Sequence, residues 1–149
     1  CINMPSQPCC KTVLTASQTN IIHGAWTVIN FNSVASPGYD VGSNFNTTTH
    51  KYTAPVSGYC LVNANVIISD ALTNVVYQLG IYVNNTYVCS CGVNGLNRSS
   101  TETIIQICDI VYATSGQTID LRFYHGDATD TADIRNYTDL TWLNITLLQ

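Results

Sequence analysis

Three carboxylates recur at every third position of one polar stretch: Asp127, Asp130 and Asp133. Hard cations such as Ca²⁺ take several oxygen ligands from carboxylates and carbonyls, and this stretch could supply them. It lacks the Asp-x-Asn/Asp-x-Asn/Asp-Gly order of an EF-hand, and carboxylates in a polar loop often only solvate it. The sequence therefore leaves two alternatives, a calcium site with no other cofactor or a solvated loop.

Cysteine is the second residue type that could do chemistry. There are seven, an odd number: Cys1, Cys9, Cys10, Cys60, Cys89, Cys91 and Cys108. Zinc sites usually take cysteine pairs two to four residues apart, and no Cys-x-x-Cys is present, so zinc is disfavoured. Structural thiols or disulfides are the alternative. We expect Cys60 to be a small buried hydrophobe, and Cys108 to be its cross-strand partner or another buried thiol. The N-terminal cysteines could link to one another's neighbours or to another chain.

The histidines give no sign of catalysis. His23, His50 and His125 lie in separate loops or strand ends, where we expect turn or surface roles. No Gly-x-Ser-x-Gly motif is present. The one glutamate, Glu102, has no visible carboxylate partner for glycoside hydrolysis. A thiol- or metal-dependent enzyme would need the Cys89 and Cys91 region beside a histidine. We predict that the chain is not an enzyme.

Composition limits the partners. The net charge is −4 and the five Lys and Arg residues are scattered, which argues against nucleic acid. No apolar run approaches the ~20 residues needed to cross a bilayer, so membrane insertion is not expected. The length fits one domain, predicted over residues 13–149, after a proline-containing tail or strap over residues 1–12. Because the chain starts with Cys rather than Met, we expect it to be the C-terminal part of a longer protein.

The elements that must position these residues are predicted to be strands. From Cys60 to Ile68 every second residue is apolar, which is typical of a central strand packed on a second sheet. Asn84-Asn85 is a strong hairpin turn, because Asn tolerates the left-handed backbone conformation. Thr103 to Ala113 is apolar on both faces and is expected to be well buried. No amphipathic helix is convincing, so the chain reads as an all-β antiparallel sandwich.

A series of motifs in fixed order carries a family resemblance: Trp26-Thr27-Val28-Ile29-Asn30-Phe31, Tyr39-Asp40, Phe45, Tyr52-Thr53-Ala54-Pro55 and Gly58-Tyr59. From Val13 to the end the chain resembles the globular heads of the C1q/TNF-like family. The sequence of these motifs is most similar to that of heads on bacteriophage tail and fibre proteins and on bacterial surface proteins. The resemblance implies a jelly-roll topology and a homotrimer that packs through apolar and aromatic faces.

The residues that alternation places outside the core are candidates for that trimer interface: Tyr59, Leu61, Tyr82, Tyr124 and Trp142. Alternatively, some of them line loops or lie under the N-terminal strap. Long polar loops at 33–46, 92–100 and 125–137 are candidates for ligand binding. Within or beside them we expect contacts from Tyr39, Asn97, Arg98 and Arg135, whose aromatic and planar groups suit sugars and peptides.

Together these features predict a non-enzymatic trimeric head domain that recognises a glycan or protein receptor on a cell surface. Its expected location is extracellular or on a virion surface, as part of a longer fibre or virion protein. The alternative is a structural role, in which the domain is a trimerisation cap or a virion decoration and binds no receptor.

Overall fold

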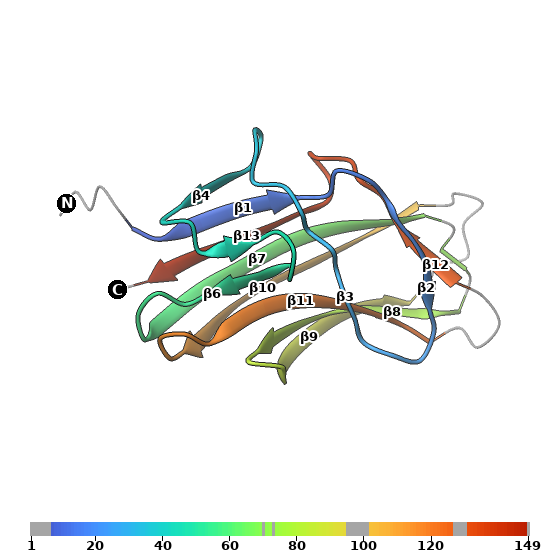
Figure 1. Cartoon of the computed structure of the whole chain (residues 1–149). Coiled ribbons are helices and arrows are strands. Elements are labelled where there is room, and N and C mark those ends of the chain that lie inside the picture. Colours follow the sequence, from blue (N-terminus) through green and yellow to red (C-terminus); the bar gives the residue numbers. More distant parts are fainter. Residues whose placement is uncertain (1–6, 70, 73, 95–101, 127–130, 149) are drawn as a thin grey trace.

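The computed structural model describes residues 7–69, 71–72, 74–94, 102–126 and 131–148. In this part of the chain two antiparallel sheets pack face to face (Figure 1). The first, called the β7 sheet, contains β1 (Cys9–Val13), β2 (Gln18–Ile22), β4 (Tyr39–Val41), β7 (Gly58–Ser69), β10 (Glu102–Ala113), β12 (Thr131–Ile134) and β13 (Trp142–Leu148). The second, called the β11 sheet, contains β3 (Thr27–Val28), β5 (Phe45–Asn46), β6 (Lys51–Thr53), β8 (Val76–Val83), β9 (Thr86–Asn94) and β11 (Thr118–His125).

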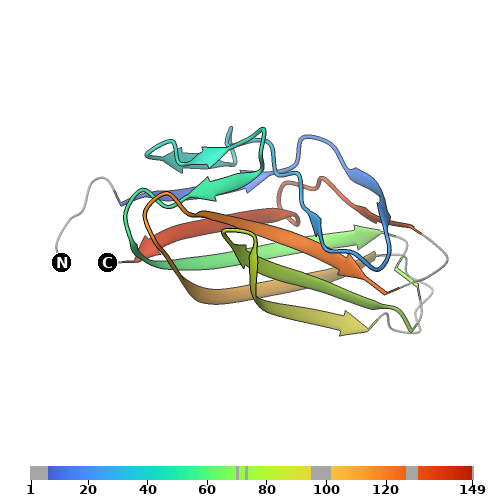
Figure 2. The same ribbon diagram turned by 60° about the horizontal axis from the view of Figure 1, so that its bottom comes forward.

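The predicted central strand is β7, and that prediction is confirmed. On one edge β7 pairs with β10 along its whole length, and on the other it pairs with β13 and then β12. Beyond β13 the sheet continues through β1 to β4. At the side of the sandwich, β10 contacts β8 and β9 of the opposite sheet (Figure 2). The β7 sheet therefore ends in a long strand, β10, with β7 as its one paired neighbour.

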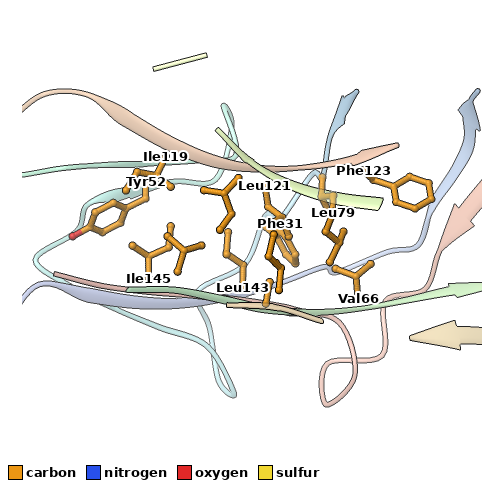
Figure 3. Packing of buried hydrophobic residues seen from close by; sticks show 14 of the residues in the cluster. Phe31, Tyr52, Val66, Leu79, Ile119, Leu121, Phe123, Leu143 and Ile145 are labelled. Atoms are coloured by element: carbon orange, nitrogen blue, oxygen red, sulfur yellow. The ribbon is translucent and has the colours of Figure 1, made fainter. Parts of the chain in front are cut away.

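The core lies between the two sheets and follows the alternation of the strands. Ile119 and Leu121 of β11 point toward Leu143 and Ile145 of β13, and Phe123 lies nearer Val66 of β7; all six are buried (Figure 3). Removing apolar surface from water stabilises the fold by about 25 cal/mol for each Å² buried. The inward faces predicted for β7, β11 and β13 are thus confirmed.

The hairpin between β8 and β9 is also confirmed. Asn84 and Asn85 have φ angles of 49° and 63°, the left-handed values that a tight two-residue turn requires. The turn places Tyr82 opposite Tyr87 across the two strands. This pairing brings aromatic side chains together on the outer side of the β11 sheet.

Three expectations differ from the structure. Residues 9–12 are not a strap but lie in β1, which pairs with β13 and β4 and so belongs to the domain. In the predicted strand from Trp26 to Phe31, buried and exposed side chains still alternate at its end. Ladder pairing is limited to Thr27–Val28, because the amide of Phe31 donates a hydrogen bond to the carbonyl of Ile29 and not to a neighbouring strand. The expectation that β10 is well buried on both faces is wrong, since its outward side chains are exposed.

No helix among the described residues is long and apolar enough to cross a bilayer.

Candidate functional site

The outward side of β7 and β10 forms one apolar surface. We call it the apolar face and define it as Tyr59, Leu61, Ile110 and Tyr112. Tyr59 lies opposite Tyr112 and Leu61 opposite Ile110 across the ladder, and the two tyrosine rings are 5.3 Å apart at their centroids. The exposed fractions of Tyr59, Ile110 and Tyr112 are 58%, 54% and 53%. A contiguous apolar surface of this kind usually marks a protein–protein interface.

A polar row borders the apolar face. Cys108 of β10, Asn63 of β7, Asn144 of β13 and Lys11 of β1 occupy successive ladder positions across four strands. Trp142, two residues before Asn144 in β13, lies opposite Asn65, and the centroid of its ring is 5.7 Å from the ammonium of Lys11. The row gives the outward side of the β7 sheet an apolar end and a polar middle.

A different cluster lies on the outward side of the β11 sheet. We call it the aromatic–cation cluster and define it as Trp26, Tyr82, Tyr87, Tyr124 and Arg122. The indole centroid is 5.9 Å from Tyr82, 6.0 Å from Tyr87 and 5.4 Å from Tyr124. The guanidinium of Arg122 lies 3.9 Å from the centroid of the Tyr82 ring, within the range of a cation–π interaction.

Gly80 of β8 makes this packing possible. A Cβ atom at that position would lie 2.8 Å from the six-membered ring of Trp26, closer than real Cβ atoms approach. The indole therefore rests directly on the strand, in space that a side chain would occupy. Because Trp26 precedes β3, a segment that is distant in sequence covers the middle of the β11 sheet.

A buried carboxylate anchors the cluster. Asp120 of β11 accepts a hydrogen bond from Nε of Arg122 at 2.6 Å, and the ammonium of Lys51 lies 3.3 Å from its other oxygen. The side-chain carbonyl of Asn85 accepts from both cations, at 2.7 Å from Lys51 and 2.9 Å from Arg122. Burial raises the pKa of Tyr82, and the neighbouring guanidinium partly opposes this shift.

The five predicted interface residues do not share one face. Tyr59 and Leu61 belong to the apolar face, and Trp142 lies on the same side of that sheet. Tyr82 and Tyr124 lie instead on the β11 sheet, in the aromatic–cation cluster. The expectation that Tyr82 is an exposed aromatic is wrong, because the residues packed on it leave only 7% of it exposed.

The predicted ligand contacts that can be placed are far apart. Tyr39 is an exposed residue of β4 and Arg135 directly follows β12, and in the β7 sheet these two strands are separated by β7, β13 and β1 (Figure 1). Asn97 and Arg98 lie outside the described residues. A binding role for these four residues stays a prediction, and the structure does not bring Tyr39 and Arg135 together.

The predicted calcium ligands can be followed only at Asp133. Its carboxylate accepts a hydrogen bond from the amide of Asn20 at 2.8 Å, which ties β12 to β2. Asp127 and Asp130 lie outside the described residues. Within the part of the chain that the structure describes, no three His, Cys, Asp or Glu side chains gather as metal ligands.

The described cysteines are free thiols with contrasting surroundings. Cys60 is buried, as predicted, and so is Cys10, whose pKa burial raises to about 12. Cys108 is exposed beside the apolar face, so the expectation of a buried thiol is wrong: its side of β10 is covered by no other described strand. Burial, helped by a hydrogen bond to Asp109, raises the pKa of Cys89 to about 12.

One of the three histidines, His125, is not the turn or surface residue that the sequence predicted. His125 is buried at the end of β11, where its Nε2 lies 2.8 Å from the carbonyl of Ile21 and its ring stacks on Tyr77. His50 pairs its Nδ1 with the carbonyl of Phe31 at 2.8 Å. The first contact joins β11 to β2 and the second joins two loop segments, so both histidines have a structural role.

Sequence reasoning did not recognise the aromatic–cation cluster as one site. Alternation does place Asp120, Arg122 and Tyr124 outward on β11, and the Asn84-Asn85 turn brings Tyr87 across from Tyr82. These signals locate four of its five members, Arg122, Tyr124, Tyr82 and Tyr87. Nothing in the local pattern places Trp26 over Gly80, because that contact joins distant segments.

Comparison with known proteins supports the fold. No family model and no curated protein matches the chain. Among solved structures it is similar to an Eiger TNF from S. frugiperda (TM-score 0.67, 10% identity, 96% of this chain and 92% of that chain). It is also similar to the globular domain of zebrafish complement 1qA protein (0.65, 13%, 96% and 98%) and to murine APRIL (0.68, 12%, 95% and 99%). The chain has the C1q/TNF-like jelly-roll fold, as the sequence predicted.

Proposed function

We propose that this chain is a non-enzymatic head domain that forms a homotrimer through the apolar face and recognises a receptor with its remaining surface. The apolar face carries the proposal. Tyr59, Ile110 and Tyr112 each leave about half of their surface in water, on the strand pair β7–β10 that ends the β7 sheet. Covering such a surface with a second protomer would remove apolar area from water, which is the main driving force of association.

The remaining features support recognition rather than catalysis. Several titratable side chains that the structure describes make internal contacts, such as Asp120 with two cations and His125 with a backbone carbonyl. Cys89, whose thiol bonds to the Asp109 carboxylate, keeps its proton because its pKa is raised to about 12, so this contact does not activate a nucleophile. The surface is rich in Asn, Thr, Ser and Tyr and poor in charge, which fits an extracellular or virion-surface location.

Light scattering of the native chain tests the trimer. We expect a solution mass three times that of the 16.2 kDa chain, with and without reductant. Ile110→Lys puts a charge in the middle of the apolar face and should give a folded monomer. Val76→Lys, a matched change at an exposed position on β8 of the other sheet, should leave the mass unchanged. A wild-type chain that stays monomeric at all concentrations would refute the assembly.

A further inference from the structure

We propose that the aromatic–cation cluster is a binding site for an acidic sugar, a pyranose ring that carries a carboxylate. The inference deepens the proposed function, on which it rests, by naming the chemistry of the receptor. It also locates the site on the outward side of the β11 sheet, away from the apolar face. Three observations lead to it: ring packing, the charges that water can reach, and a polar rim.

The ring packing excludes a cationic ligand. A site for a quaternary ammonium needs rings spaced widely enough to admit the cation between them. Here Tyr82 and Tyr87 are 5.8 Å apart and Trp26 lies within 6.0 Å of both, so the rings contact one another. The guanidinium of Arg122 already covers a face of Tyr82. What remains for a ligand is the outer surface of Trp26, Tyr87 and Tyr124, onto which the C–H face of a sugar ring can stack.

The charges favour an anion. Lys51, Asp120 and Arg122 are the Asp, Glu, Lys and Arg residues on the strands of the β11 sheet, which gives this sheet a net charge of +1 in a chain of net charge −4. The carboxylate of Asp120 is fully buried, whereas 20% of the Lys51 side chain and 16% of the Arg122 side chain are exposed. A ligand therefore meets the cations and not the carboxylate between them.

The rim offers groups for sugar hydroxyls. Asn85 lies at the exposed hairpin turn beside the aromatic rings, and its carbonyl is already held by Lys51 and Arg122. This leaves the amide nitrogen as the part of Asn85 that can donate to a ligand. Tyr87, which is 50% exposed, shares a hydrogen bond with Ser90 at 2.9 Å, so a second polar edge lies on the other side of the rings. Aromatic surface with a few fixed polar groups is the usual composition of a small-ligand site.

Tryptophan fluorescence can report binding at this site. The chain has two tryptophans, Trp26 in the cluster and Trp142 on the opposite sheet, so a Trp142→Phe variant leaves Trp26 as the reporter. The probes are the methyl glycosides of glucuronic acid and of N-acetylneuraminic acid, with methyl glucoside as the neutral control. We expect a saturable change in emission with an acidic glycoside, weak or no change with the neutral one, and weaker binding as salt is added.

Variants separate the contributions of the rings and the charge. Tyr87→Ala and Lys51→Gln should each weaken binding by about tenfold, the scale of one stacking or charge-assisted contact. Lys11→Gln makes the same change in charge on the β7 sheet and should leave the affinity unchanged. Equal effects of the two lysine variants would overturn the assignment of the site. Saturable binding of an acidic peptide in place of the sugars would overturn the ligand class.

Light scattering on the same samples distinguishes the two proposals. A trimer that binds neither acidic glycoside refutes this inference and leaves the assembly intact. A monomer that binds one of them refutes the trimer and leaves the site intact.

Discussion

The outward-facing aromatic residues of the two sheets differ in how far the chain itself covers them. Both sheets bury aliphatic residues inward, and both carry aromatic residues on their outer side. On the β11 sheet other parts of the chain cover Tyr82: Trp26, which lies on Gly80, packs against it on one side, and Arg122 lies over its ring. On the β7 sheet the rings of Tyr59 and Tyr112 contact each other, and more than half of each residue is exposed to water. An aromatic residue that points outward therefore indicates an interface only where no distant segment returns to cover it.

The largest expected effect comes from removing the cation that covers the β11 side. Arg122→Ala leaves the buried carboxylate of Asp120 with Lys51 as its one ionic partner and uncovers a face of Tyr82. Breaking a buried ion pair in this way should lower the free energy of unfolding by about 3 kcal/mol, measured by urea denaturation. Lys11→Ala, on the β7 side, should cost less than about 1 kcal/mol. Equal losses for the two variants would contradict the contrast between the sheets.

A smaller effect is expected from filling the space under Trp26. In Gly80→Ala the new methyl group would displace the indole, with a loss of about 2 kcal/mol and emission shifted to longer wavelength as Trp26 enters water. Gly126→Ala is the control, because a Cβ atom there would meet its nearest neighbour at 3.9 Å. Unchanged stability and emission in Gly80→Ala would mean that the cluster does not hold the indole in place.

Thiol reactivity tests whether the apolar face is covered in solution. Cys108 lies opposite Asn63 beside that face, and we expect iodoacetamide to modify it about tenfold more slowly in the assembled protein than in the Ile110→Lys monomer. Cys91, an exposed thiol of β9, should react at similar rates in both. Mass spectrometry identifies the modified residues and gives the rate at each. An equal rate of Cys108 modification in the assembled protein and in the monomer would argue against the proposed interface.

The last effect, which is about 1 kcal/mol for each pH unit, concerns the core that both sheets share. Burial raises the pKa of Cys10 to about 12, so between pH 9 and 12 the unfolded chain loses a proton that the folded chain keeps. The free energy of unfolding should therefore fall as the pH rises, by about 1 kcal/mol for each pH unit from this thiol. Urea midpoints measured over this range give the slope. Cys10→Ala should make the free energy of unfolding depend less steeply on pH. An unchanged dependence would show that Cys10 does not cause it.

Sequence alone predicts the features that depend on local pattern. The alternation from Cys60 to Ile68 identifies the central strand, and Asn84-Asn85 identifies the hairpin. The pattern fails at β10, where both faces are apolar, because periodicity cannot tell a buried apolar side chain from an exposed one. It also fails for Trp26 and Tyr82, whose contact joins segments more than fifty residues apart. The apolar face was predicted in part, and the aromatic–cation cluster required the three-dimensional arrangement.

The pairing of β1 with β13 has a mechanical consequence. Cys9, at the start of β1, lies opposite Thr146, near the end of β13, so both strands open onto the same end of the sandwich (Figure 2). A pulling force applied between the two would peel β1 from β13 one residue pair at a time, which needs little force. A force between the start of β1 and the opposite end of the sandwich would load the ladder pairs of β1 together, in shear. The same strand pair is thus weak in one direction of pull and strong in the other.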